Sequence, residues 1–343
     1  MSGTFITSSY STTPFPVLQT VDAIYFTIII LCFTVGTIGN TLALRYFLTK
    51  TRDIPTSIYI MISIADILIT ILVLPLGLPY LLYNRQGWLL ETSTVFCTIW
   101  GMSWYVLLVL TIFLVAILSI TRTIQIVCPF RTLSKKAVIG VILGYMAVLI
   151  VQSTIPMWVD EVYEYDFYMT HHCSWRNDIL NGTAYHAYTQ VIFFETYFPI
   201  FPILISCILT IRSLKSSENS ALNQANREVT ITIILFTVLY IVCNLPQIVM
   251  HFITIIGQTF KSSESVRKLM DWDRPYFYWF KFYMLLLVPI NSALNPVLYL
   301  WRMKKMREST KNMFKRCMEV ANEKIGSPLS TARKMSVTAV TRV

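Results

Sequence analysis

Charged residues are scarce in this sequence and make up only 13% of its 343 residues, whereas hydrophobic residues make up 55%. A soluble globular domain carries about a quarter charged residues. The composition therefore excludes an ordinary soluble domain and indicates a membrane protein. The chain also lacks a recognisable internal repeat, which argues against transporter folds built from two duplicated halves.

Lysine and arginine are absent before Arg45, and residues 1–21 are uncharged and rich in Ser and Thr. This stretch lacks the basic start and the apolar core of a cleaved signal peptide. We therefore expect residues 1–21 to form an extracellular N-terminus and the first apolar run to act as an uncleaved anchor.

Long apolar runs dominate the remainder, and each exceeds the ~20 residues that a helix needs to cross ~30 Å of hydrocarbon. They lie at about 22–46, 56–82, 94–126, 137–159, 187–212, 229–256 and 275–300. With the N-terminus outside, 21 of the 28 basic residues fall on the cytoplasmic side, as the positive-inside rule favours. We predict an all-α membrane protein of the plasma membrane, a seven-transmembrane helix bundle. The net charge of +10 then reflects a face apposed to anionic lipid and not nucleic-acid binding.

The chain after the last run is basic and partly amphipathic. Spacing of Trp301, Met306 and Phe314 predicts a short amphipathic helix over 302–316, lying on the inner leaflet. Cys317 follows it and is either palmitoylated or an unmodified surface cysteine. Residues 317–343 have the composition of a disordered cytoplasmic tail.

Two of the seven cysteines, Cys97 and Cys173, are the only ones expected on the extracellular side, in an oxidising compartment. A disulfide between them would pin the outer loop 160–186 to the third run, and the alternative is two free thiols. The same loop carries Asn181-Gly-Thr183, which predicts glycosylation at Asn181.

Polar residues interrupt the last run in the stretch from Asn291 to Tyr299, which also contains Pro296. An unpartnered amide in hydrocarbon costs several kcal/mol, so these groups are expected to face other helices. Asp66 is the only acid deep inside any run. Together they predict an internal polar network, with a bend at Pro296.

The order of these features resembles the rhodopsin-like (class A) G-protein-coupled receptors over about residues 22–316. The matching residues are Asn40, Asp66, Cys97, Arg122, Pro129, Pro246, Asn295, Pro296 and Tyr299. On a helix Cys97 and Arg122 lie ~37 Å apart, at opposite membrane surfaces. The resemblance implies a receptor domain over 22–301 followed by the family's helix 8 over 302–316, and no enzymatic activity. It also implies roles in coupling and activation for Arg122, Pro246, Asn295, Pro296 and Tyr299.

The same resemblance implies an allosteric sodium ion. Asp66, Thr111, Asn291 and Ser292 would supply one carboxylate and neutral oxygens, which suit a hydrated hard cation. The alternative is a protonated Asp66 hydrogen-bonded to Asn40 and Asn295.

Family geometry directs nine side chains into a ligand pocket: Trp104, Tyr105, Leu108, Glu195, Asn244, Gln247, Ile248, His251 and Lys281. Glu195 would bind a ligand cation, pair with Lys281 or His251, or reach water. Trp104 replaces the Asp of aminergic receptors and Pro289 replaces the Lys of opsins, which argues against an amine bound in that way and against retinal. The acidic, aromatic loop 158–168 is interpreted either as a β-hairpin lid that favours a basic peptide or as a solvated loop.

Several positions depart from the family pattern. Thr121 replaces the acid before Arg122, and Asn244 replaces a Trp in the sixth run. Because Thr cannot form a charge-assisted bond to Arg122, we predict weaker restraint of the inactive state and raised basal signalling. Thr123 also replaces an aromatic residue.

The resemblance implies that a ligand displaces the sixth helix and that a heterotrimeric G protein then binds, with arrestin recruited to the phosphorylated tail. The alternatives are a non-signalling or atypical seven-transmembrane receptor and a seven-span transporter or channel.

Overall fold

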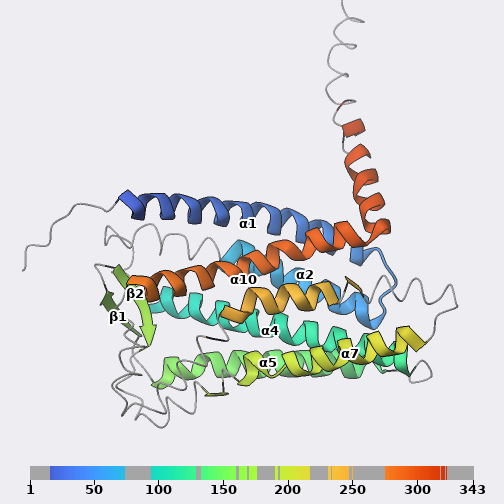
Figure 1. The fold of residues 1–343 in the computed structure, drawn as a ribbon, viewed down its shortest axis with the longest axis horizontal. Helices are drawn as coiled ribbons and strands as arrows, with labels where there is room; N and C mark the ends of the chain where they lie inside the picture. Colours follow the sequence, from blue (N-terminus) through green and yellow to red (C-terminus); the bar gives the residue numbers. More distant parts are fainter. Residues whose placement is uncertain are drawn as a thin grey trace, which may run out of the picture.

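The computed structural model describes residues 16–73, 94–128, 133–159, 162–167, 170–175, 190–191, 194–216, 231–232, 234–246, 249, 275–316, 318–320 and 322. Long helices lie side by side along one axis, with α1 and α10 on one side and α5 and α7 on the other (Figure 1). α4 runs between the two sides, in contact with α2, α5 and α7.

Most of the chain is helical. The regular helices are α1 (Pro16–Leu48), α2 (Ile54–Leu68), α4 (Thr94–Val127), α5 (Lys135–Val159), α7 (Ile200–Ser216), the segment Ile234–Pro246 and α10 (Pro275–Arg302). Among the described residues, five helical stretches are long and apolar enough to cross a membrane. They are Phe26–Leu48, Ile54–Leu72, Tyr105–Val127, Lys135–Thr154 and Phe194–Ser213.

The core is apolar and lies between α4 and its neighbours, where Val109, Ile112 and Leu114 are fully buried. Conversely, α5 exposes large aliphatic side chains such as Val141 and Val151. A helix with apolar groups on its free face is expected where lipid and not water is the solvent.

The two ends of the bundle differ. A β-hairpin of β1 (Val162–Phe167) and β2 (Thr170–Trp175) lies at the end where α1 begins (Figure 1). Only β1 lies within the stretch 158–168, for which a hairpin was one of two interpretations, and β2 follows that stretch. β1 contacts α4. At the opposite end, which also carries Arg122 and is called the Arg122 end below, α10 stops at Arg302 and a further helix runs over 304–316. Met306 of that helix is buried in the main core cluster and anchors it.

Two helices contain irregular turns, and a third contains two prolines. α2 passes into a π-helical turn, η1 (Ile69–Val73), where the Thr70 hydroxyl lies 3.0 Å from the carbonyl oxygens of both Asp66 and Ile67. The helix before α7 is interrupted at Phe198–Pro199, since proline cannot donate a backbone hydrogen bond. α10 contains Pro289 and Pro296 and remains helical through both.

Candidate functional site

A polar network occupies the middle of the bundle. Asp66 is fully buried, and its Oδ2 accepts a hydrogen bond of 2.8 Å from Nδ2 of Asn295. This bond joins α2 to α10. It confirms that the polar residues of the last run and the deep acid belong to one internal network, called the Asp66 network below.

Pro296 explains how α1 joins the Asp66 network. A proline inside a helix leaves the carbonyl four residues earlier without its backbone donor, and here that carbonyl belongs to Ser292. Asn40 fills the position, because its Nδ2 donates to the Ser292 oxygen at 3.0 Å. Gly39 makes this approach possible, since a Cβ there would lie 2.6 Å from Cγ of Pro296. The glycine, amide and proline therefore act as one unit.

The π-helical turn η1, which continues α2, adds a bond to α1. Thr37 donates its hydroxyl hydrogen to Oγ1 of Thr70 at 3.3 Å, and Thr70 in turn donates to the Asp66 carbonyl at 3.0 Å. Gly36 faces the same threonine, and an added Cβ would collide with Cγ2 of Thr70. Thr70 could not be singled out from the sequence, because a π-turn shifts which residues face inward.

The remaining sodium-site residues are also buried. Asn291 and Ser292 are 8% and 1% exposed, and Thr111 is 3% exposed. Thr111 donates to the carbonyl of Leu107 at 2.8 Å, which leaves its oxygen able to accept or to coordinate. Leu107 packs on Ala65 and Ile69, so this turn of α4 lies against the turn of α2 that holds Asp66.

Several oxygens of the Asp66 network are buried without a hydrogen-bond partner among the described residues, including Oδ1 of Asp66, Oδ1 of Asn295 and Oδ1 of Asn40. Unpaired buried oxygens are costly unless a cation or a water satisfies them. The donor set therefore fits a hard cation. Asn40 bonds the Ser292 carbonyl and not Asp66, so of the two amides in the alternative interpretation only Asn295 bonds the acid.

Four aromatic rings surround the inner part of α10 and are called the Tyr299 cluster. Phe47 stacks on Tyr59 with 4.9 Å between the ring centroids. The Tyr299 ring packs edge-on against both, with centroid distances of 5.4 Å to Phe47 and 5.5 Å to Tyr59. Phe236 of the segment Ile234–Pro246 lies 4.9 Å from Tyr299. Tyr299 is fully buried, and its hydroxyl has no partner among the described residues. The cluster thus holds α1, α2, α10 and the 234–246 segment together.

Neutral groups surround Arg122. Its Nη1 donates to Oε1 of Gln125 on the same helix at 3.2 Å, and the Thr121 hydroxyl donates to the carbonyl of Leu118. Within the part of the chain that the structure describes, no carboxylate pairs with this guanidinium. The absence of an acid at position 121 is therefore not compensated by another described acid.

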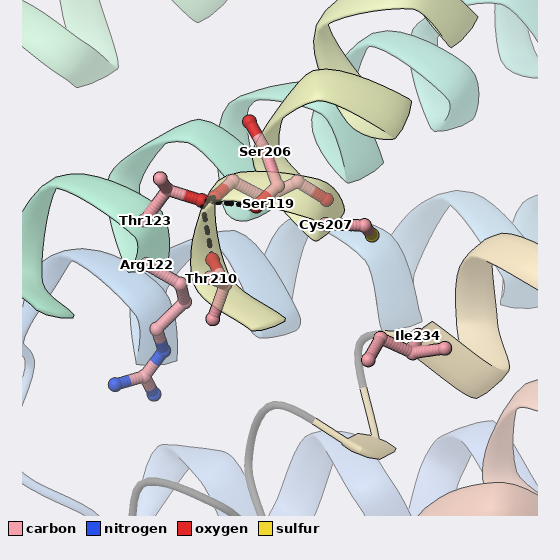
Figure 2. A pocket seen from close by; sticks show the side chains of 7 residues that line it. All are labelled: Ser119, Arg122, Thr123, Ser206, Cys207, Thr210 and Ile234. Carbon is pink, nitrogen blue, oxygen red and sulfur yellow. Dashed lines mark hydrogen bonds between the residues drawn. The ribbon is translucent and has the colours of Figure 1, made fainter. Parts of the chain in front are cut away.

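A small cavity, partly open to solvent, lies beside Arg122 and is bounded by three helical segments (Figure 2). It is lined by Ser119, Arg122, Thr123, Ser206, Cys207, Thr210 and Ile234. The guanidinium points away from the contact between Thr123 and Thr210, as Figure 2 shows.

The predicted ligand-pocket residues are only partly brought together by the described structure. The Tyr105 hydroxyl donates to Oε2 of Glu195 at 2.8 Å, which joins α4 to the helical turn before α7. Leu108 packs with Ile112 and Tyr240. The Asn244 amide donates to the Tyr240 carbonyl at 2.8 Å, while its buried Oδ1 has no partner among the described residues.

Other predicted site residues lie outside what the structure describes. Gln247, Ile248, His251, Asn181 and Cys317 are not among the described residues, and the side chains of Trp104, Lys281, Cys97 and Cys173 are not described. Pro246 ends the described helical segment. The disulfide, the glycosylation and the lipidation remain predictions.

The sequence matches the 7 transmembrane receptor (rhodopsin family) over residues 39–299. The chain belongs to this family. The match confirms the seven-helix membrane bundle and the resemblance that the motifs indicated, and it makes this multi-pass membrane protein a receptor and not an enzyme.

Similar proteins include human Proteinase-activated receptor 3, which is 26% identical over 313 residues, covering 89% of this chain and 76% of the relative. Galanin receptor 2b of Danio rerio is 24% identical over 301 residues, covering 83% and 73%. Human G-protein coupled receptor 183 is 24% identical over 330 residues, covering 90% and 86%.

Proposed function

We propose that this receptor binds an extracellular ligand at the hairpin end of the bundle and activates a heterotrimeric G protein at the Arg122 end. The observation that carries the proposal is the position of Arg122. It stands beside a cavity between α4, α7 and the 234–246 segment, with only a neutral amide as its partner among the described residues. The Arg122 guanidinium would therefore be available to a G protein once the 234–246 segment moves.

Two contacts would break when that segment moves. Phe236 would leave the Tyr299 ring, and Thr237 would leave Sγ of Cys207, which it approaches at 3.7 Å. The first contact is between aromatic rings and the second is between neutral groups, so both are weak. A ligand that favours the open state by a few kcal/mol would therefore shift the receptor population toward that state. Tyr299 would then be free to turn toward Arg122.

The test is G-protein activation in cells at matched surface amounts, without added ligand and with each class of G protein in turn. We expect measurable basal activation by the natural chain and loss of it in Arg122→Ala. Arg52→Ala, a change of an exposed arginine between α1 and α2, serves as the matched control. Activation that persists in Arg122→Ala would contradict the proposed coupling, and no activation of any class would favour the non-signalling receptor.

For the ligand we propose a basic peptide. The half-buried Glu195 carboxylate is held by Tyr105, and β1 supplies acidic and aromatic residues at the same end of the bundle. A cation would gain from a preorganised carboxylate in a low-dielectric site. A peptide library read by G-protein dissociation would test this: Glu195→Gln should weaken cationic ligands tenfold or more. Neutral ligands should keep their affinity, and equal loss for both would contradict the charge pairing.

We also propose that sodium binds at Asp66, with Thr111, Asn291 and Ser292 as oxygen ligands. The buried unpaired Oδ1 of Asp66 supports this assignment. When bound, the ion would neutralise the buried carboxylate, while Asn295 orients that carboxylate through its amide. We further propose that the N-terminus is extracellular and the C-terminus cytoplasmic, that Cys97 and Cys173 form a disulfide, and that arrestin binds the tail.

A further inference from the structure

Thr123 is the centre of a group of close oxygens between α4 and α7. Its Oγ1 lies 2.9 Å from the Ser119 carbonyl, 3.1 Å from the Ser206 carbonyl and 2.9 Å from Oγ1 of Thr210 (Figure 2). Thr123, Ser206 and Thr210 are all less than a tenth exposed. Two of these three contacts cross from one helix to the other.

Counting protons fixes the direction of the bonds. A threonine hydroxyl has one proton, and backbone carbonyls can only accept. Thr123 therefore gives its proton to the Ser119 or the Ser206 carbonyl, and Thr210 must donate to Thr123. Thr123 is both donor and acceptor, whereas Thr210 is a donor in this pair. Loss of the Thr123 hydroxyl then leaves more groups unpaired than loss of the Thr210 hydroxyl.

The same turn of α7 also contacts the segment Ile234–Pro246. Cys207 lies next to Ser206 in the chain, and its Sγ is 3.7 Å from Oγ1 of Thr237. A continuous set of neutral side chains thus runs from α4 through α7 to the 234–246 segment. Apart from Thr237, this set lines the cavity beside Arg122 (Figure 2).

We propose that Thr123 and Thr210 form an interhelical clasp that positions α7 against α4 at the Arg122 end and so holds the surface on which the 234–246 segment packs. The clasp takes the place of a charged restraint, which Thr121 cannot provide. Its two threonines are positioning residues. The inference rests on the proposed function only for its effect on signalling, because the clasp itself is a contact between two helices.

The expected effect of losing the clasp on the equilibrium between closed and open arrangements follows from the bond type and the membrane environment. Between helices in a membrane, one side-chain hydrogen bond changes an equilibrium by about threefold on average. A clasp of this size restrains the closed arrangement and still releases without a large barrier. The closed arrangement should therefore be favoured but not exclusive, which agrees with a receptor of raised basal activity.

The experiment uses the full-length chain with Thr123→Val, Thr210→Val and the double change, which remove hydroxyls while keeping the branched shape. Thr210→Ser keeps the hydroxyl at this position. Thr34→Val is the matched control, because the exposed Thr34 hydroxyl donates to the Ile30 carbonyl of its own helix. One readout is basal G-protein activation per receptor at the cell surface. The second is the distance between spin-labelled side chains at Val127 and Ile211, which are both exposed. That readout needs neither ligand nor G protein.

The clasp predicts that each valine variant lengthens and broadens the spin-label distance and raises basal activation about threefold, with Thr123→Val at least as large as Thr210→Val. The double variant should not exceed Thr123→Val, and Thr210→Ser should match the natural chain. Distances equal to those of Thr34→Val, additive effects, or Thr210→Ser behaving like the valine variant would overturn the clasp. Lengthened distances without a change in activation would support the clasp and count against the proposed coupling.

Discussion

The Asp66 network and the Arg122 end both contain buried polar groups but are held in different ways. In the first, a carboxylate, amides and a proline-freed carbonyl join α1, α2 and α10. In the second, threonine hydroxyls join α4 and α7, and Arg122 has only a neutral partner among the described residues. Charge-assisted bonds are about twice as strong as neutral ones. The chain thus keeps a firm middle and a weakly restrained end.

Removal of Tyr299 should have the largest effect, because its ring ties the two regions together. Tyr299→Ala should destabilise the purified receptor by about 3–5 kcal/mol, the cost of emptying a buried aromatic site. Tyr299→Phe keeps the ring and removes a hydroxyl that has no partner among the described residues, so its stability should be unchanged or higher. Thermal unfolding in detergent measures both, and equal losses would contradict the packing role of the ring.

A smaller effect is expected from filling the approach between α1 and α10. Gly39→Ala places a Cβ against Pro296 and should cost about 1–3 kcal/mol by overpacking. Gly144→Ala is the matched control, since a Cβ there meets nothing within 4 Å and alanine favours helix. If Gly39→Ala were as stable as Gly144→Ala, the close contact would not be needed for the Asp66 network.

Sodium should stabilise the middle of the bundle and leave the Arg122 end unaffected. Replacing choline chloride by sodium chloride should raise the unfolding temperature by a few degrees, for about 1 kcal/mol of binding linkage. Asp66→Asn should abolish this shift, and the Arg122→Ala variant should keep it. A shift that survives in Asp66→Asn would place the ion elsewhere or show a general salt effect.

The Asp66 network could be predicted from the sequence to a large extent. A deep acid and a polar stretch around a proline have few ways to be satisfied in hydrocarbon, so Asp66 and Asn295 had to find each other. The Asn40 bond to Ser292 follows from the same logic, because Pro296 frees that carbonyl. The sequence interpretation nevertheless paired Asn40 with Asp66, so the sequence placed Asn40 in the network but did not give its partner.

The Arg122 end could not be predicted in the same detail. Which residues of α7 face α4 depends on the break at Phe198–Pro199, and a shift of one residue would turn Thr210 to another face. Thr123 was recognised as a departure, but its partners were not. Neutral hydroxyls are common in apolar helices and bond their own backbone just as readily, so their presence does not predict an interhelical contact.

The most direct test of a weakly restrained Arg122 end is basal G-protein activation of Thr121→Asp against the neutral, similarly sized Thr121→Asn, at equal surface amounts. An added carboxylate beside Arg122 should lower basal activation by up to about fivefold, the effect of a partly exposed ion pair. Thr121→Asn should leave basal activation at the natural level. Basal activation of the natural chain no higher than that of Thr121→Asp would contradict the account.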